Sequence, residues 1–199
     1  MYIALDNEMG GVTLDYSLLT SYLVVLDVDL NPIDDLELYV KPDDGIYRVC
    51  GQAMNVNKID LAQHDTKAIY YKEAGTKLYQ FLKKNSDSGK IKLTPIGHGI
   101  YGDIAFITHC LMKTETWETF TSYRKLDTQA VCQFLKLCGK FPEGVSGSLE
   151  SLGKHFGILR DENRNCFNTQ VEFVTGDLHN AKTDTLLTVE VLKHLKTLV

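Results

Sequence analysis

Short apolar runs open the chain and have the character of strands. Residues 2–5 form an apolar run that leads into acids, and residues 21–28 are rich in β-branched and apolar side chains. Residues 36–40 alternate apolar and polar side chains before a Lys-Pro pair. These patterns are typical of strands that share a sheet. We therefore expect the chain to begin as a β-meander.

Apolar side chains farther along recur at spacings of three and four, as an amphipathic helix requires. Residues 67–84 show this period and end in a turn-rich stretch at residues 85–89. The residues after it predict a buried strand at 91–97. Further helices are predicted at 103–112, 126–138, 149–156 and 180–198. Residues 163–176 give no readable pattern.

The order of these elements predicts a mixed sheet covered by helices. A chain of 199 residues, 44% hydrophobic and 24% charged, can bury one sizeable core. No repeat or linker divides it, so we expect a single domain over residues 1–199. An acid follows the short first apolar run, and no run approaches the roughly 18 apolar residues of a membrane span. We expect an intracellular protein, cytoplasmic or otherwise, that is not secreted and does not bind a membrane.

The cysteines form an odd set of five without a Cys-x-x-Cys pair. That pattern argues against a disulfide framework and against a structural zinc site. We expect reduced thiols that are mostly buried. The set is Cys50, Cys110, Cys132, Cys138 and Cys166.

Two acids follow the first apolar run, at Asp6 and Glu8. Side chains alternate in an extended segment, so both point to the same side of the strand. Hard divalent cations such as Mg²⁺ prefer carboxylate oxygens, so the pair could bridge metal ions. An Asp-x-Glu triplet also arises by chance, and Asp35-Leu36-Glu37 is a second one.

Two later segments carry acids near predicted helix starts. Gly97-His98-Gly99 leads through a glycine-rich turn to Asp103, and His179 precedes Asp184 by five residues. Asp103 could simply cap its helix. Asp184 lies on a face lined by Leu and Val, where an unpaired carboxylate is costly to bury. A bound metal would explain it, and a hydrogen-bonded core acid is the alternative.

Together, these segments resemble the DEDDh, or DnaQ-like, exonuclease family of the ribonuclease H-like superfamily. The order and spacing of Asp6/Glu8, of Gly97-His98 through Asp103, and of His179-x-Ala181-x-x-Asp184 match the motifs of that family. Residues 57–60 and 126–128, each with the predicted helix after it, look like its connecting segments. The resemblance implies a mixed five-stranded sheet flanked by helices.

The resemblance also implies a function, namely metal-dependent 3′→5′ hydrolysis that releases nucleoside monophosphates from single-stranded DNA or RNA. By resemblance, Asp6 bridges two Mg²⁺ ions, for which Mn²⁺ can substitute. Glu8 and Asp184 then complete the site that holds the water, Asp103 holds the second metal, and His179 is the general base. The expected setting is proofreading, repair or RNA turnover.

Spacing leaves a second histidine open, because His98 also precedes an Asp by five residues. We assign His98 to the surroundings of the site, with a structural or substrate-facing role, because it precedes a turn that must be held in shape. The related subgroup with a catalytic tyrosine has that residue four positions before the last Asp. Here that position is Asn180, which favours the histidine subgroup.

The substrate-facing residues depart from the family pattern. Gly99 and Gly102 stand where Asn and Phe are usual, so terminal-base preference cannot be transferred from relatives. Met9 could pack against the last nucleotide or belong to the core. Backbone amides around Met9 and Gly10 could bind the terminal 3′-hydroxyl, because glycine permits a close approach.

The charge of the chain limits how it could bind nucleic acid. The formal net charge of −5 argues against a strong general grip on long duplexes. Two divalent cations add four charges, and −5 + 4 gives −1. We therefore expect local binding of single-stranded 3′ ends, with a polymerase or a second copy of the chain as further partners.

Two questions stay open at the sequence level. One alternative to catalysis is a non-catalytic member that binds nucleic acid or a polymerase, which the glycine substitutions and low basicity suggest. Tyr101 and Tyr123 are candidates for base stacking, yet most aromatic residues in a domain of this size belong to the core. DNA and RNA are not distinguished, because contacts to the 2′-hydroxyl do not show in one sequence.

Overall fold

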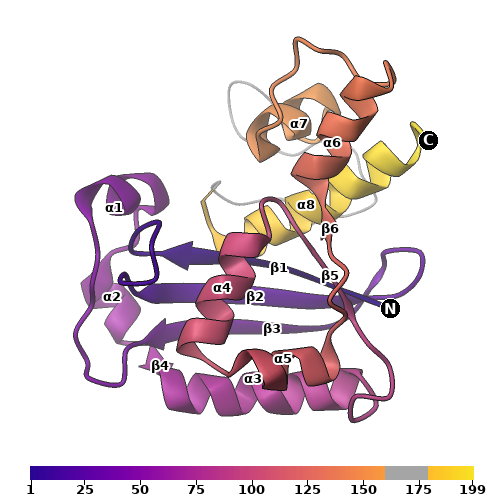
Figure 1. Cartoon of the computed structure of the whole chain (residues 1–199). Coiled ribbons are helices and arrows are strands. Elements are labelled where there is room, and N and C mark those ends of the chain that lie inside the picture. Colours follow the sequence, from indigo (N-terminus) through magenta and orange to yellow (C-terminus); the bar gives the residue numbers. More distant parts are fainter. Residues whose placement is uncertain (160–178) are drawn as a thin grey trace.

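A mixed six-stranded sheet forms the centre of the molecule, in the order β4-β3-β2-β1-β5-β6 (Figure 1). The computed structural model describes residues 1–159 and 179–199. Strands β1 (Tyr2–Met9), β2 (Leu18–Leu26) and β3 (Pro32–Lys41) form the expected antiparallel meander. The short strands β4, β5 and β6 pair in parallel with β3, β1 and β5, respectively. Their bounds are Ile69–Tyr70, Thr94–Gly97 and Leu126–Asp127.

Helices cover both faces of this sheet, which confirms the predicted α/β class (Figure 1). The sheet has six strands and not five. Helices α3, α4 and α5 pack on one face, and α8 crosses the other. The helices are α1 (Gly51–Asn57), α2 (Leu61–Asp65), α3 (Tyr71–Asn85), α4 (Tyr101–Cys110), α5 (Thr114–Phe120), α6 (Thr128–Leu137), α7 (Leu149–His155) and α8 (Ala181–Lys196).

Successive side chains of β1 point to opposite faces of the sheet, so this strand contributes to the core on both faces. Ile3 and Leu5 are buried in the cluster formed with α3, α4 and α5, whereas Ala4 is buried in the cluster formed with α8. The same alternation continues past Leu5. It directs Asp6 toward α8 and Asn7 toward α4, so β1 contributes polar side chains to both layers at its carboxyl end.

A separate apolar cluster joins α6 and α7 to the carboxyl-terminal half of α8. Leu187, Val191 and Leu195 of α8 are fully buried in it, as their spacing of four residues predicts. This contact anchors α8 at a distance from the sheet. The segment that had no readable pattern, 163–176, lies outside the described residues, and so does Cys166.

Most expected elements differ in their bounds; the strand expected at 91–97, for example, begins at Thr94. The helix expected at 67–84 begins at Tyr71, because Ile69 and Tyr70 pair with the end of β3. The helix expected at 126–138 begins at Thr128, because Leu126 pairs with Ile96 and the side chain of Asp127 caps the helix. The helix expected at 103–112 begins two residues earlier, at Tyr101.

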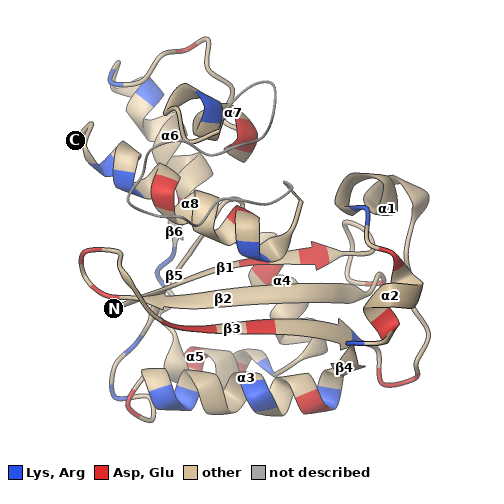
Figure 2. Ribbon diagram, turned by 180° about the vertical axis from the view of Figure 1, so that it is seen from behind, with Lys and Arg blue, Asp and Glu red and all other residues tan. Residues whose placement is uncertain are grey.

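Charged residues are distributed unevenly over the helices and strands (Figure 2). Lysines line the outer side of α3, whereas acids lie along β3 and at the carboxyl end of β1 (Figure 2). Within the described residues, none of the helices is both long and apolar enough to span a bilayer. The cysteines of the described part are free thiols.

Candidate active site

Three carboxylates meet where β1 ends beside the start of α8. One oxygen each from Asp6, Glu8 and Asp184 lies within 4.8 Å of the other two. Asp6 and Glu8 come from the face of β1 that alternation directs toward α8, and Asp184 lies in the first turn of that helix. All three are half-buried. Segments far apart in the sequence therefore converge on one acidic cluster.

Asp103 reaches this cluster from the opposite layer. It lies in the first turn of α4 and is buried, with 6% of its surface exposed. The backbone N–H of Asn7 donates to Asp103 Oδ1 at 3.1 Å, and Asn7 Nδ2 donates to the Asp103 carbonyl at 3.0 Å. Asn7 thus fixes α4 to β1 between the two acids of the triplet.

The pKa values of the four acids are all raised above their usual range, chiefly by burial. Burial, and then the charges of Asp103, Asp184 and Glu8, raise the pKa of Asp6 well above its usual range. Burial and the neighbouring acids raise the pKa of Glu8 to about 8. Burial also raises the pKa of Asp103 to about 7 and that of Asp184 to about 6. Like charges so close together are costly without a compensating cation.

The donor set of this cluster fits a divalent cation. Asp184 Oδ2 accepts a hydrogen bond from the backbone N–H of His179 at 3.1 Å. Asp184 Oδ1 is buried, and no described donor reaches it. An orphaned carboxylate oxygen among other carboxylates is the environment that Mg²⁺ or Mn²⁺ satisfies. Asp6, Glu8 and Asp184 are the residues that could hold such an ion, with Asp103 beside them.

The two candidate histidines lie in different surroundings. His179 is exposed beside the cluster, with a left-handed backbone at φ 67°, and its backbone N–H contacts Asp184. The His98 ring is half-buried, and its Nδ1 lies 2.9 Å from the hydroxyl of Thr128. Burial lowers the pKa of His98. The structure therefore brings His179 to the acids and places His98 against the start of α6.

Asn180 separates His179 from α8 and caps that helix. Its side chain accepts hydrogen bonds from the backbone N–H groups of Lys182 and Thr183, at 3.1 and 3.3 Å. Such a cap fixes the first turn of the helix, in which Asp184 lies. Asn180 occupies the position of the tyrosine in the other subgroup, and here the residue has a structural task.

Two pockets open on either side of Glu8. One has a volume of about 320 Å³ and extends from Glu8 and His179 to Tyr39, His64 and Lys67. The other has a volume of about 480 Å³ and is mainly apolar. Its lining includes Met9, Val12, Tyr16, Ala53 and Val56. Glu8 and Asn57 border both pockets, so the acidic cluster adjoins two concave surfaces.

Met9 and Gly10 connect β1 to the wall of the apolar pocket. Met9 is half-buried and lines it, and the Met9 carbonyl accepts a hydrogen bond from Asn57 Nδ2 at 3.2 Å. The Gly10 N–H donates to the Ser17 carbonyl at 2.8 Å, so this amide already has a partner within the chain. A Cβ at Gly10 would lie 2.5 Å from the Arg48 carbonyl. Close backbone packing, and not an approaching substrate, accounts for glycine here.

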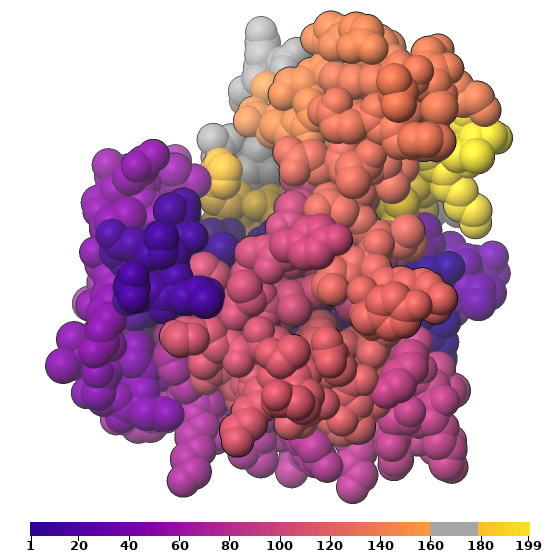
Figure 3. Space-filling view, viewed as in Figure 1, coloured from indigo at the N-terminus to yellow at the C-terminus, as the bar shows by residue number. Residues whose placement is uncertain are grey.

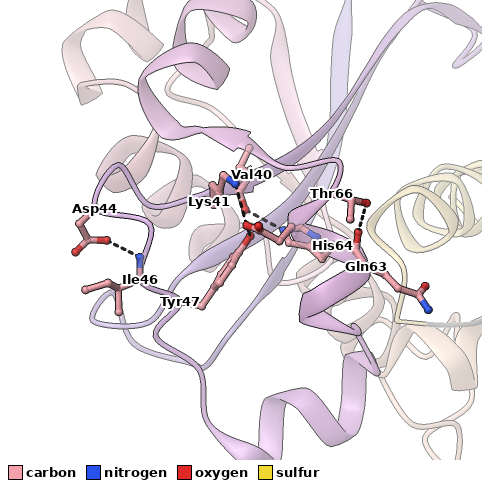
Figure 4. A network of polar contacts seen from close by, with 9 residues as sticks. Val40, Lys41, Asp44, Ile46, Tyr47, Gln63, His64 and Thr66 are labelled. Carbon is pink, nitrogen blue, oxygen red and sulfur yellow. Dashed lines mark hydrogen bonds and ion pairs between the residues drawn. The ribbon is translucent and has the colours of Figure 1, made fainter.

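A polar network supports the far wall of the smaller pocket (Figure 4). His64 is buried, and its Nε2 lies 3.0 Å from the Val40 carbonyl. Lys41 Nζ and the Tyr47 hydroxyl both donate to Asp65 Oδ1, at 2.9 and 3.0 Å. This network ties α2 to the end of β3. His64, which matched no motif, is thus a packing residue at the edge of the pocket.

Sequence reasoning did not single out Asn7 and Asn57, which hold the site together. Asn7 contacts a residue 96 positions away, and Asn57 contacts one 48 positions away. No local pattern reveals such partners. The one available signal was the polar residue Asn7 in a strand whose other inward-facing positions, Ile3 and Leu5, are apolar.

Solved structures of exonuclease I have the same fold as this chain. Exonuclease I from Methylocaldum szegediense superposes with a TM-score of 0.73 at 18% identity, covering 98% of this chain and 40% of its own. E. coli exonuclease I in complex with a dT13 oligonucleotide gives a TM-score of 0.67 at 16% identity, with 98% and 41% covered. The chain has the exonuclease I fold. A zinc-bound complex of the E. coli enzyme with single-stranded DNA is similar to the same degree, with a TM-score of 0.67, 16% identity and 98% and 40% covered.

The likeness to exonuclease I covers nearly all of this chain but less than half of the longer proteins. The chain spans about 40% of the length of the exonuclease I chains. The sequence itself matches no protein-family model and no curated protein. The comparison therefore establishes the fold alone, at a sequence identity of 18% or less, and it is a fold found in exonucleases, as the resemblance implied.

Proposed function

We propose that this chain is a metal-dependent 3′→5′ exonuclease that releases nucleoside monophosphates from single-stranded ends. The observation that carries the proposal is the convergence of Asp6, Glu8 and Asp184 within 4.8 Å, in a chain with the exonuclease I fold. We also propose that residues 1–199 form a single exonuclease domain. A polymerase or homodimer partner and an intracellular location stay predictions.

The acids would act together as a metal site. Asp6, Glu8, Asp103 and Asp184 would hold two Mg²⁺ or Mn²⁺ ions, which supply an activated hydroxide and positive charge at the attacked phosphodiester when bound. The raised pKa values of Glu8, about 8, and Asp184, about 6, support this, because a cation replaces the protons that these groups otherwise bind. Asn7 would keep Asp103 in place as a positioning residue.

His179 is the proposed general base. It is exposed beside the cluster, and the cap at Asn180 fixes the backbone that carries it. A neutral imidazole at this position can accept a proton from the attacking water. The hydrogen bond from its own backbone N–H to Asp184 couples the position of the base to that of an acid.

We place the terminal nucleoside in the apolar pocket beside Glu8. Met9, Tyr16 and Val56 offer apolar surface there, and Asn57 supports the wall between the two pockets. A flexible thioether such as that of Met9 can pack against any base. The amide of Gly10 is already bonded to Ser17, so it has no role in binding the 3′-hydroxyl in this proposal.

The test is hydrolysis of 5′-labelled single-stranded DNA and RNA of equal sequence in Mg²⁺ or Mn²⁺. We expect a ladder that shortens from the 3′ end and is abolished by EDTA. His179→Ala should slow it about 10²- to 10⁴-fold, the usual contribution of a general base. His109→Ala is the matched control, because His109 is an exposed histidine at the other end of α4. Binding without cleavage across metals and pH would instead identify a non-catalytic binding module.

A further inference from the structure

Two exposed tyrosines lie near the start of α4, outside the site described above. Tyr101 has 68% of its surface exposed and Tyr123 has 70%. Single exposed rings are common on protein surfaces, whereas exposed rings gathered in one place mark binding sites. Neither ring is part of the core clusters. The interior of the protein therefore does not account for them.

Two cations join these tyrosines into one surface. Lys125 Nζ lies 5.4 Å from the centroid of the Tyr101 ring and donates a hydrogen bond to the Tyr123 carbonyl at 3.2 Å. The Arg124 guanidinium lies 4.8 Å from the centroid of the Tyr123 ring. We call these four residues, Tyr101, Tyr123, Arg124 and Lys125, the aromatic-basic patch.

Within residues 1–159 and 179–199, the positive charge of this patch has no acidic partner. Among the described residues, no carboxylate forms an ion pair with Arg124 or Lys125. By contrast, Lys41, which also lies over a tyrosine ring, is paired with Asp65. In a chain with a net charge of −5, two cations without an ion-pair partner among the described residues, lying beside exposed rings, form a local site for an anion with planar groups.

Tyr101 of the patch and Asp103 of the acidic site both belong to the first turn of α4, which is flanked by glycines. Tyr101 and Asp103 lie two residues apart in α4, so their side chains point to roughly opposite sides of the helix. A Cβ at Gly102 would meet nothing within 4 Å, and one at Gly99 would meet only Gln129 Oε1, at 4.0 Å. Figure 3 shows the face on which α4 and the residues before β6 lie side by side, next to a hollow that separates them from the amino-terminal residues.

We propose that the aromatic-basic patch binds the single strand upstream of the cleaved 3′ end. Bases stack on Tyr101 and Tyr123, while Arg124 and Lys125 contact the phosphates between them. Stacking tolerates any base, because every base has a π-face. A single-stranded nucleic acid supplies planar groups and regular negative charge together, whereas an acidic peptide would match only the cations. The inference rests on the proposed exonuclease function and extends it to a second binding surface.

The experiment compares hydrolysis of a strand of about 16 nucleotides with hydrolysis of a dinucleotide that is too short to reach the patch. In Tyr101→Leu and in Tyr123→Leu, the ratio of kcat/KM for the long strand to that for the dinucleotide should fall about tenfold for each ring removed. Tyr101→Phe should keep the ratio. The matched control is Tyr70→Leu, because Tyr70 is 48% exposed and carries Lys41 5.2 Å from its ring centroid, but lies on β4.

A binding measurement in EDTA separates this inference from the proposed function. Fluorescence anisotropy with labelled dT and U strands gives the dependence of the binding constant on salt. Arg124→Gln and Lys125→Gln should each reduce the slope of log K against log salt by about 0.7. If the wild type shortens no strand, the proposed exonuclease function fails, while the slopes still test the patch. If ratio and slopes equal those of the wild type in all variants, the patch serves another partner and the inference is overturned.

Discussion

Two Asp-x-Glu triplets lie on the same sheet, and only one of them belongs to the candidate site. Asp6-Asn7-Glu8 ends β1, and Asp35-Leu36-Glu37 lies in β3. Tyr22 of β2 pairs with Asp6 on one side and Glu37 on the other, so acids of both triplets point to the same face. Helix α8 packs over β1 and β2 and leaves Asp35 and Glu37 exposed. The same Asp-x-Glu pattern is therefore partly buried beside α8 in β1 but exposed to solvent in β3.

The acids of the two triplets differ in the groups that surround their carboxylates. Glu37 accepts a hydrogen bond from the Tyr39 hydroxyl at 2.8 Å and is otherwise solvated. Glu8 is half-buried, and the charges of Asp184 and Asp103 contribute to its raised pKa. Exposed acids need no partner, whereas acids gathered under a helix need protons or a cation. A metal site is therefore recognised by unsatisfied carboxylates and not by the triplet itself.

The largest expected difference between the triplets is in activity. Glu8→Gln should reduce exonuclease activity by about 10³-fold, because a lost metal ligand removes several kcal/mol of transition-state stabilisation. Glu37→Gln keeps an oxygen for the Tyr39 hydroxyl and should leave activity unchanged. The measurement is the initial rate of release of nucleoside monophosphates. Equal rates for both variants would show that the β1 triplet contributes no more to activity than the β3 triplet.

The next difference is in how stability depends on pH without metal. The pKa of Glu8 is about 8 and that of Asp184 is about 6, above their ordinary values of 4.5 and 3.8. Between these values these two groups bind more protons in the native state than in the unfolded chain, so their contribution to stability is complete below about pH 4 and is lost as the pH rises to about 8. Even a loss on the order of 3 kcal/mol, less than half of what the two shifts would give in full, lowers the Tm by roughly 6–12 °C.

Thermal melts in EDTA, at steps between acid and mildly alkaline pH, measure this slope. Glu8→Gln should flatten it, because the neutral amide does not titrate, and Mg²⁺ should restore stability at alkaline pH. Glu37→Gln should keep the full slope. A metal-free wild type whose Tm rises over the same interval would contradict the assignment of raised pKa values to this cluster.

The middle residues of the triplets give the smallest difference. Asn7→Ala leaves the Asp103 carbonyl without its side-chain donor, which costs about 1–3 kcal/mol. Leu36→Ala truncates a half-buried side chain that packs against the core and should cost a similar amount. Urea unfolding measures both losses. Activity should fall about tenfold only in Asn7→Ala, since a displaced catalytic group costs rate; equal activities would reduce Asn7 to a packing role.

The sequence predicted the layers of the fold better than the ends of its elements. The three-residue and four-residue spacing in 67–84 indicated α3, yet it could not show that Ile69 and Tyr70 pair with Val40 and Lys41. Helices α1 and α5 have seven residues each, too few to display a clear helical repeat. Pairing partners and short helices depend on tertiary contacts that a local pattern does not contain.

The candidate site was predicted as separate motifs, and its supports were not. The order of Asp6, Glu8, Asp103 and Asp184 along the chain indicated the cluster before any geometry was known. Asn7 could not be assigned a role, because its partner is 96 residues away and on another layer. The exposure of Tyr101 also depends on how α4 packs, so periodicity alone did not separate it from core aromatic residues.

The central claim is that Asp6, Glu8 and Asp184 bind divalent metal and the β3 triplet does not. Calorimetric titration of the metal-free protein with Mn²⁺ tests it directly, using wild type, Asp6→Asn and Asp35→Asn at equal ionic strength. We predict saturable binding to wild type and to Asp35→Asn, and an affinity at least about tenfold weaker in Asp6→Asn. A wild type that binds no Mn²⁺, or equal weakening in both variants, would contradict the claim.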